Sequence, residues 1–297
     1  MLFCCTIILY VIRCYTNELQ KKYDTKTFFK KRFLKVLIPF IFWAIIMFIW
    51  KIYILKSMPE IDGMKNWINA FFNNKEESTY YFMYSILGIY LTMPILSLLT
   101  EENHRKTLWF TVSLYFIFNS FIPNILSLFK ITYNTNAQVL LGGYTIFVIL
   151  GYLLSTEELS KKKKIMLYVF TVIGVLYRFL TTFILSKKYG YVVKITWGYT
   201  SWHSILLASS VFVIIKNLFT KQINLSEKQA DLLSKISRCS FGIYLIHQIV
   251  MYYEKTIFNI NSAMWEWRTI GVITTYIISL IIVLCIKKIP IIKKIVP

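Results

Sequence analysis

FFKKRFLKVLIPFIFWAIIMFIW, residues Phe28–Trp50, joins a basic cluster directly to an apolar run long enough to cross a membrane. The cluster consists of Lys30, Lys31, Arg32 and Lys35. Because a charged side chain at the centre of a bilayer costs about 2.5–3.5 kcal/mol, these cations are expected at a water boundary. Basic residues beside membrane helices are retained mostly in the cytoplasm. This stretch therefore predicts a depth, an orientation and an anion-binding edge.

The composition extends this interpretation to the whole chain. Of its 297 residues, 57% are hydrophobic and 16% are charged, whereas soluble domains average about 45–50% apolar and about 25% charged residues. Apolar runs of membrane-spanning length recur along the sequence, which predicts an all-α, polytopic transmembrane bundle. No linker is long enough to separate two cores, so residues 1–297 are expected to form one domain.

The net charge of +20 invites comparison with nucleic-acid-binding proteins, but the cations lie between apolar runs. In that position they act as topology signals and attract the headgroups of the lipid bilayer, so no nucleic-acid partner is expected. The five cysteines have no metal-ligand spacing, and unpaired structural thiols and no metal are expected.

Nine hydrophobic segments are expected to form helices, with the longest connection, Lys51–Thr79, on the outer side. Lys and Arg are more numerous in the alternate connections that begin with Arg13–Lys35, which places that loop and the C-terminus in the cytoplasm. Nine crossings then place the N-terminus outside. The segments are Leu2–Ile12, Phe33–Leu55, Tyr80–Leu99, Leu108–Ile122, Val139–Leu154, Ile165–Leu185, Ile195–Ile215, Phe241–Tyr253 and Thr269–Ile286.

Three cations near the start of the second segment form a candidate phosphate site. Arg32 and Lys35 are three residues apart, a spacing that brings two side chains to one face of an α-helix, and Lys31 adds a third charge. Such a cluster can bind phosphate groups, with Arg supplying forked donors. The alternative is a simple topology anchor.

Three polar residues inside the apolar segments are further candidates. Arg178 lies about eight residues from the predicted outer end of its segment, a depth of roughly 12 Å, and it is either a structural charge or a ligand contact. His203 is expected at a similar depth, and His247 lies nearer to mid-membrane. Each histidine is either a general base or a satisfied interior group.

Other kinds of chemistry lack their sequence signals. The chain contains no P-loop, no GxGxxG, no GxSxG and no HExxH motif. Carboxylates are almost missing from the apolar segments, which disfavours a cation-coupled transporter.

Four passages resemble the acyltransferase-3 family of bacterial membrane O-acyltransferases. The basic cluster and the helix after it are similar to the family's RxxR element followed by IP and an aromatic pair. The others are similar, in order, to its WYLxxLIGLYLxxPIL, YFLLGYxL and SFGIYLIH patterns. The passages are Phe29–Trp43, Tyr81–Leu96, Tyr144–Leu154 and Lys235–His247.

The resemblance implies a ten-helix core in the bacterial cell membrane and transfer of an acyl group from cytoplasmic acyl-CoA. Acetyl-CoA is the expected donor, and a hydroxyl of an envelope polysaccharide or glycolipid is the expected acceptor. Lys31, Arg32 and Lys35 would lie near the CoA phosphates, and Arg178 would contact the acceptor. Lys35 stands where the family has a second arginine, so the charge is kept without the forked geometry.

The family's catalytic histidine belongs to its first helix, and none of the nine segments corresponds to that helix. The sequence is therefore interpreted as lacking one helix at its start, with His203 and His247 as the candidate substitutes for the base. Two alternatives stay open, a non-catalytic export or assembly protein for polysaccharide or lipid, and a truncated, inactive family member.

Overall fold

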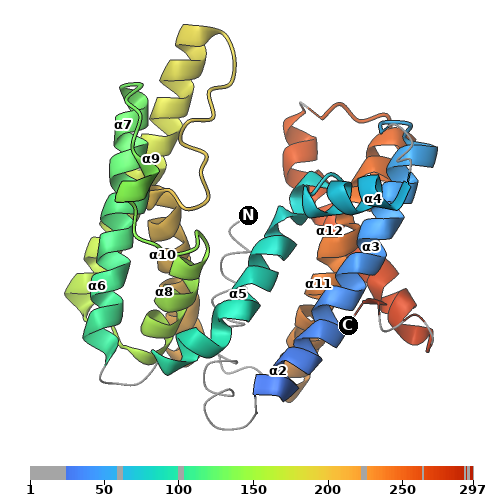
Figure 1. Ribbon diagram of the computed structural model, residues 1–297, viewed down its shortest axis with the longest axis horizontal. Coiled ribbons are helices and arrows are strands. Elements are labelled where there is room, and N and C mark those ends of the chain that lie inside the picture. Colours follow the sequence, from blue (N-terminus) through green and yellow to red (C-terminus); the bar gives the residue numbers. More distant parts are fainter. Residues whose placement is uncertain are drawn as a thin grey trace. The chain divides into compact units, whose positions relative to one another are not determined.

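A computed structural model describes residues 25–58, 63–99, 104–221, 226–262, 264–290, 292 and 295–296. Over these residues the chain forms helices and connections, and no strand occurs in them. The predicted all-α fold is therefore confirmed (Figure 1). The predicted segment Leu2–Ile12 lies outside the described residues, whereas each of the other eight overlaps a helix.

Six helical stretches are long and apolar enough to cross a membrane, and a seventh, α8, is apolar but shorter. The eighth, α11, is apolar only over the half that was predicted, Phe241–Tyr253, and begins fourteen residues earlier. The bounds are α2 Thr25–Arg32, η1 Phe33–Leu37, α3 Ile38–Ile49, η2 Trp50–Ile54, α4 Gly63–Phe72, η3 Ser78–Tyr80, α5 Tyr81–Leu98, α6 Arg105–Tyr115, η5 Phe116–Phe121, α7 Ile122–Leu128, η6 Thr135–Ala137, α8 Thr145–Thr156, α9 Lys161–Tyr189, α10 Trp202–Lys221, α11 Glu227–Ile257 and α12 Trp265–Lys288.

The described residues fall into two compact units, and each is described by itself. Unit 1 contains the described part of residues 91–224, and unit 2 contains residues 25–90 together with the described part of 225–297. That residues 1–297 form a single functional domain stays a prediction.

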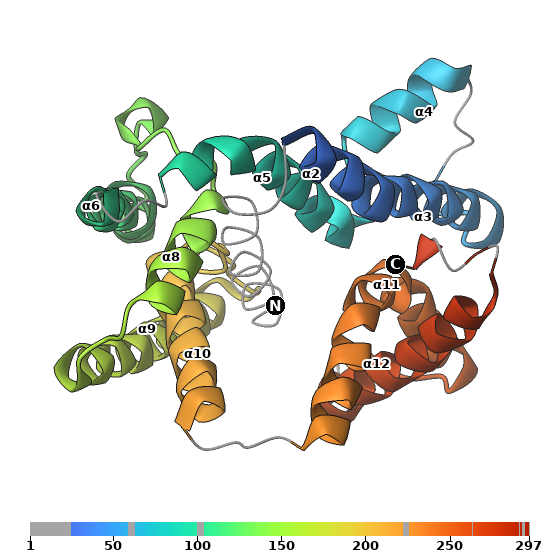
Figure 2. The ribbon, with the colours of Figure 1, turned by 90° about the horizontal axis from the view of Figure 1, so that it is seen from below.

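Unit 1 is built around α9 and α10, which run side by side (Figures 1 and 2). The Ser160 side chain caps the first turn of α9 by accepting a hydrogen bond from the Lys163 amide. Gly190 ends the helix at φ +75°, a conformation that costs little only for glycine. Between these ends, the hydroxyls of Thr171 and Ser210 lie 2.6 Å apart and join the two helices.

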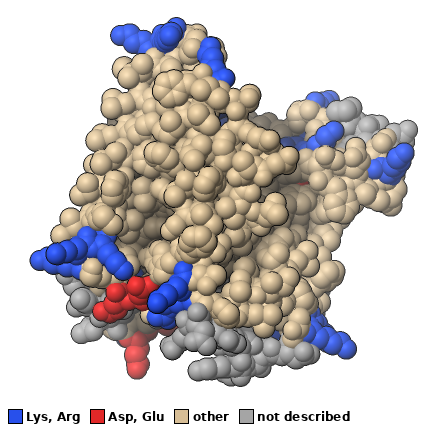
Figure 3. All heavy atoms as spheres, turned by 60° about the vertical axis from the view of Figure 1, so that its left-hand side comes forward, with Lys and Arg blue, Asp and Glu red and all other residues tan. Residues whose placement is uncertain are grey.

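Apart from Arg178, the charges of α9 lie at its two ends, as expected for a membrane helix. Four lysines, Lys161–Lys164, open the helix, and Lys187 and Lys188 lie in its last turn. In the space-filling view of this side of the molecule, an uncharged band separates charged groups at the two ends (Figure 3). The long apolar middle of α9 is largely exposed, which fits a surface that faces lipid.

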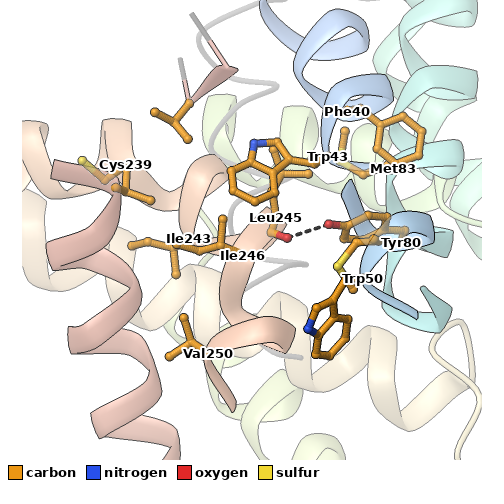
Figure 4. Close-up of a cluster of buried hydrophobic side chains, with 13 residues drawn as sticks. Phe40, Trp43, Trp50, Tyr80, Met83, Cys239, Ile243, Leu245, Ile246 and Val250 are labelled. Atoms are coloured by element: carbon orange, nitrogen blue, oxygen red, sulfur yellow. Dashed lines mark hydrogen bonds between the residues drawn. The ribbon is translucent and has the colours of Figure 1, made fainter. Parts of the chain in front are cut away.

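Unit 2 packs α3, the start of α5, α11 and α12 around a buried apolar cluster (Figure 4). Tyr80 donates a hydrogen bond from its hydroxyl to the Leu245 carbonyl at 2.6 Å, which ties α11 to the residues before α5. Trp43 in α3 donates from its indole to the Ile295 carbonyl at 3.0 Å. The end of the described chain therefore packs into the core of unit 2.

Helix α4 is an element that the sequence did not predict, because Lys51–Thr79 was interpreted as a loop. Trp67 packs its ring against Phe48, 5.9 Å away between centroids, and Phe71 packs against Phe40 at 5.7 Å. Beside this face, the helix carries large exposed apolar residues at four-residue spacing, namely Met64, Ile68 and Phe72. This pattern is that of an amphipathic helix with one face on the protein and the other on a non-aqueous surface.

In unit 1, one lysine caps the C-terminal end of α8. The ammonium of Lys216, on α10, donates to the carbonyls of Leu154, Ser155 and Glu157 at 2.9, 3.1 and 3.1 Å. These carbonyls belong to the last turn and C-cap of α8, where no intrahelical donor remains. A cation at this position also complements the negative end of the helix dipole.

Replacing Lys216 with Met should lower the free energy of unfolding by about 1–3 kcal/mol, because three carbonyls lose their charged donor. Thermal unfolding in lipid nanodiscs, followed by tryptophan fluorescence, measures the effect as a lower Tm. Lys187→Met, at an exposed position of α9, is the matched control and should leave Tm nearly unchanged. Equal Tm values for the two variants would contradict the capping role.

Candidate functional site

The predicted phosphate cluster lies at the start of the first described helical stretch, in unit 2. Arg32 ends α2, and its guanidinium carbon lies 5.5 Å from the ring centroid of Phe28 and 5.3 Å from that of Tyr90. Lys31 and Lys35 are exposed, whereas Arg32 is partly buried. The cluster therefore combines a guanidinium packed against a pair of aromatic rings with two exposed ammonium groups.

The backbone around this cluster departs from α-helical geometry. Residues Phe33–Leu37, which include Lys35, form a π-helical turn. α-Helical spacing predicts that Arg32 and Lys35 share a face. The π turn rotates the side chain of Lys35 away from that predicted direction. Such turns are frequent at functional sites. Lys35 therefore remains part of the basic cluster, but the π turn determines the direction of its side chain.

In unit 1, His203 and Arg178 lie close together. His203 is the second residue of α10 and is 2% exposed. It packs against Gly174 on α9, one helical turn from Arg178, and the charge of Arg178 is close enough to act on the imidazole. Gly174 lies near the middle of the apolar run Ile165–Leu185, so His203 is level with the middle of that run. The structure thus brings together two of the predicted site residues.

The predicted segment Ile195–Ile215 is helical only from Trp202, and the residues before it return along α9 as irregular chain (Figure 1). The Val193 amide donates to the Ser186 hydroxyl at 2.9 Å. Further along, the hydroxyls of Thr182 and Thr196 lie 3.1 Å apart, and Ser120 donates to the Thr200 carbonyl at 2.7 Å. Irregular backbone at membrane depth is tolerated where protein groups satisfy it or where it lines a cavity, and it commonly marks a binding site.

This returning segment determines the tautomer of His203. The Nε2 atom lies 2.9 Å from the Thr196 carbonyl oxygen. Because a carbonyl can only accept, Nε2 must carry the hydrogen, and in the neutral ring Nδ1 then presents a lone pair. Nδ1 is buried and has no hydrogen-bond partner in the described part of the protein, and the same is true of the neighbouring Trp202 Nε1. One acceptor and one donor are therefore available for a bound molecule.

His247, in unit 2, has a different environment. Its Nδ1 lies 2.6 Å from the Tyr244 carbonyl of the same helix and therefore donates to it. Its Nε2 lies 3.2 Å from the amide nitrogen of Gln248, which can donate to it. Both ring nitrogens therefore have a partner, as in a satisfied interior histidine, and of the two predicted histidines His203 has the geometry of a base.

A charged cluster in unit 2 was not predicted. Glu76 and Glu77 are 0% and 8% exposed, and Lys51 Nζ lies 3.2 Å from Glu77 Oε2. Burial raises the pKa of the Glu76 carboxyl, although its hydrogen bond with Tyr84 and the charge of Lys51 act in the opposite direction. The sequence signal was a pair of glutamates immediately before an apolar segment, which usually indicates a solvated loop end. Among the described residues, no group of three His, Cys, Asp or Glu side chains could hold a metal ion.

Gly174→Ala should disturb the His203 site directly. A Cβ at Gly174 would lie 2.8 Å from His203 Cβ and 3.2 Å from its Cα, so α10 would have to move, at a cost of about 1–3 kcal/mol. Thermal unfolding should show a lower Tm. Gly88→Ala is the matched helical control, because its Cβ would meet nothing within 4 Å. A Tm for Gly174→Ala as high as that of the control would contradict the close packing.

Comparison with known proteins agrees with this architecture. A family model described as an acyltransferase domain matches residues 1–284, which include all four passages quoted from the sequence. Searches of curated proteins and of solved structures found no significant match. With a helical membrane fold and a match over nearly its whole length, the chain belongs to the acyltransferase-3 family.

Proposed function

We propose that this protein transfers an acyl group, most simply acetyl, from acyl-CoA to a hydroxyl of an envelope polysaccharide or glycolipid. The family supports membrane acyltransferase activity in general. The observation that carries the proposal is His203, a buried imidazole whose tautomer is fixed and whose other nitrogen has no partner among the described residues. The proposed setting is the bacterial cell membrane, with the C-terminus in the cytoplasm.

The donor would bind at the basic cluster of Lys31, Arg32 and Lys35. CoA carries phosphate groups, for which a guanidinium packed against Phe28 and Tyr90 is a preorganised partner. The two exposed lysines would add attraction without a fixed geometry. In the proposed topology this cluster faces the cytoplasm, where acyl-CoA is available.

The acceptor would bind beside His203 and Arg178. Nδ1 of His203 takes the proton of the acceptor hydroxyl as its oxygen attacks the thioester carbonyl carbon. The carbon–sulfur bond then breaks, and the leaving CoA thiolate takes up the proton from His203, which restores the neutral imidazole. The ester formed on the acceptor and free CoA are the products. Arg178, whose guanidinium carbon lies 6.0 Å from the Trp197 ring centroid, would hold a polar group of the sugar near the base.

Arg32→Ala should raise KM for acetyl-CoA about tenfold or more with a smaller change in kcat, because it removes charge-assisted contacts to the donor. Transfer of radiolabel from acetyl-CoA to envelope material in membrane vesicles measures both constants. Arg268→Ala, at an exposed position in the first turn of α12, is the matched control. An unchanged KM for Arg32→Ala would remove the donor-binding role.

His203→Gln should lower kcat by about 10²–10⁴-fold, the usual contribution of a general base. The glutamine amide can still donate to the Thr196 carbonyl, so the fold of the returning segment should survive. His104→Gln, at an exposed position before α6, should leave kcat unchanged. Wild-type-like transfer by His203→Gln would exclude His203 as the base, and no transfer by the wild type would favour a non-catalytic role in export or assembly.

A further inference from the structure

Tyr84, at the start of α5, contacts two oxygen atoms. Its hydroxyl lies 2.5 Å from the carbonyl oxygen of Phe71, in the last turn of α4, and 2.6 Å from Glu76 Oε1. The other carboxyl oxygen, Glu76 Oε2, is buried and has no hydrogen-bond partner within the described ranges. The Tyr84 hydroxyl is thus within hydrogen-bond distance of two oxygen atoms from two other segments of unit 2.

Counting hydrogens shows what this arrangement requires. A neutral tyrosine has one hydroxyl hydrogen, whereas a backbone carbonyl and an ionised carboxylate can only accept. With Glu76 ionised, Tyr84 could satisfy one of its two neighbours, and the other pair of oxygen atoms would be in contact without a hydrogen. With Glu76 protonated, the carboxyl donates to the Tyr84 oxygen and Tyr84 donates to Phe71. Both contacts then have a hydrogen between their oxygen atoms, which contacts this short require.

The charges around Glu76 lead to the same conclusion. Glu77 is paired with Lys51 from η2 and also accepts from the Ser78 hydroxyl at 3.1 Å and the Thr79 amide at 3.3 Å. A buried group of one cation and two ionised carboxylates would carry an uncompensated negative charge, which is costly. The titratable groups that face this group are Lys51, Glu77, Tyr80, Tyr84 and, on α11, His247. Among these, Lys51 is the one cation that offsets the carboxylates.

We propose that Glu76 is a proton-binding site of the folded protein and that its proton stabilises the packing of α4 against α5. One face of α4 is held by ring packing of Phe71 on Trp67 and Tyr84. The hydrogen bonds from Glu76 through Tyr84 to the Phe71 carbonyl fix the last turn of the helix. Loss of the proton breaks one of these bonds and adds a second buried negative charge. The end of α4 should then detach from α5.

The sign of the pH effect follows from the raised pKa of Glu76 in the folded protein. The stabilisation is fully present below the pKa of an unfolded glutamate and is lost as the pH rises through the folded pKa. At alkaline pH the end of α4 should therefore separate from α5, and at acidic pH it should stay packed against α5.

Hydrogen exchange of α4 amides in lipid nanodiscs, corrected for the intrinsic rate at each pH, tests the proposal. In the wild type, protection of residues 63–72 should fall about tenfold as the pH rises, a loss of about 1.4 kcal/mol. Glu76→Gln, whose amide can donate to Tyr84 permanently, should keep its protection at every pH. Glu266→Gln, an exposed glutamate on α12, is the matched control and should follow the wild type.

Two further measurements keep the test decisive if Glu76→Gln folds poorly. Tyr84→Phe should lower α4 protection at every pH, because both hydrogen bonds are lost. Infrared spectra on the acidic side of the transition in α4 protection should show the carbonyl stretch of a protonated carboxylic acid in the wild type and in Glu266→Gln, with that of Glu76 missing in Glu76→Gln. The same pH profile in the wild type and Glu76→Gln, or a carboxylic acid band unchanged by that substitution, would overturn the proposal. None of these readouts depends on acyl transfer.

Discussion

A bilayer offers no water to backbone groups, and most features of this protein follow from that constraint. Helices satisfy their own amides and carbonyls, so all eight apolar segments in the described ranges are helical. Where helices end or the chain becomes irregular, side chains provide hydrogen-bond partners for the backbone. Lys216 covers the carbonyls at the end of α8, and Ser186, Thr182 and Ser120 accompany the segment that returns along α9. The polar side chains of unit 1 therefore lie where the backbone needs partners.

The same constraint gives His203 its chemical character. The Thr196 carbonyl, left without a helical partner, is satisfied by Nε2 of the imidazole, and the ring thereby exposes its other lone pair. A structural requirement of the returning segment thus leaves Nδ1 as a buried acceptor, which is the feature on which the proposed role of a base rests. The basic cluster of unit 2 is different in kind, because its guanidinium is fixed by the rings of Phe28 and Tyr90 while its lysines face outward.

Hydropathy predicted the number and order of the described membrane helices, because burial of an apolar run in lipid dominates every local preference. It placed two boundaries wrongly, since Val139–Leu154 and Ile195–Ile215 become helical at Thr145 and Trp202. Apolar residues in those connections, among them the exposed Leu140, Ile195 and Trp197, extend the hydrophobic runs beyond the helices. Helix α4 escaped prediction because it is only 10 residues long and lies within a polar connection.

For the site, the sequence predicted similar depths for Arg178 and His203, and it contained no information that α9 and α10 would bring the two residues close together. The direction of the His203 lone pair depends on a carbonyl that folding brings back to it, and no sequence pattern contains that information. Glu76 was missed for a related reason, because two adjacent glutamates at the end of a connection resemble solvated charges. Their burial depends on packing by α4, an element that the sequence did not predict.

The π-helical turns affect how this chain should be compared with its relatives. Residues Phe33–Leu37, Trp50–Ile54 and Phe116–Phe121 hydrogen-bond over five residues instead of four. Each turn shifts the phase of the helix, so side chains before and after it that are spaced for one α-helical stripe point in different directions. Substitution patterns across these helices must therefore be divided at the π turns before lipid-facing and interior positions can be assigned.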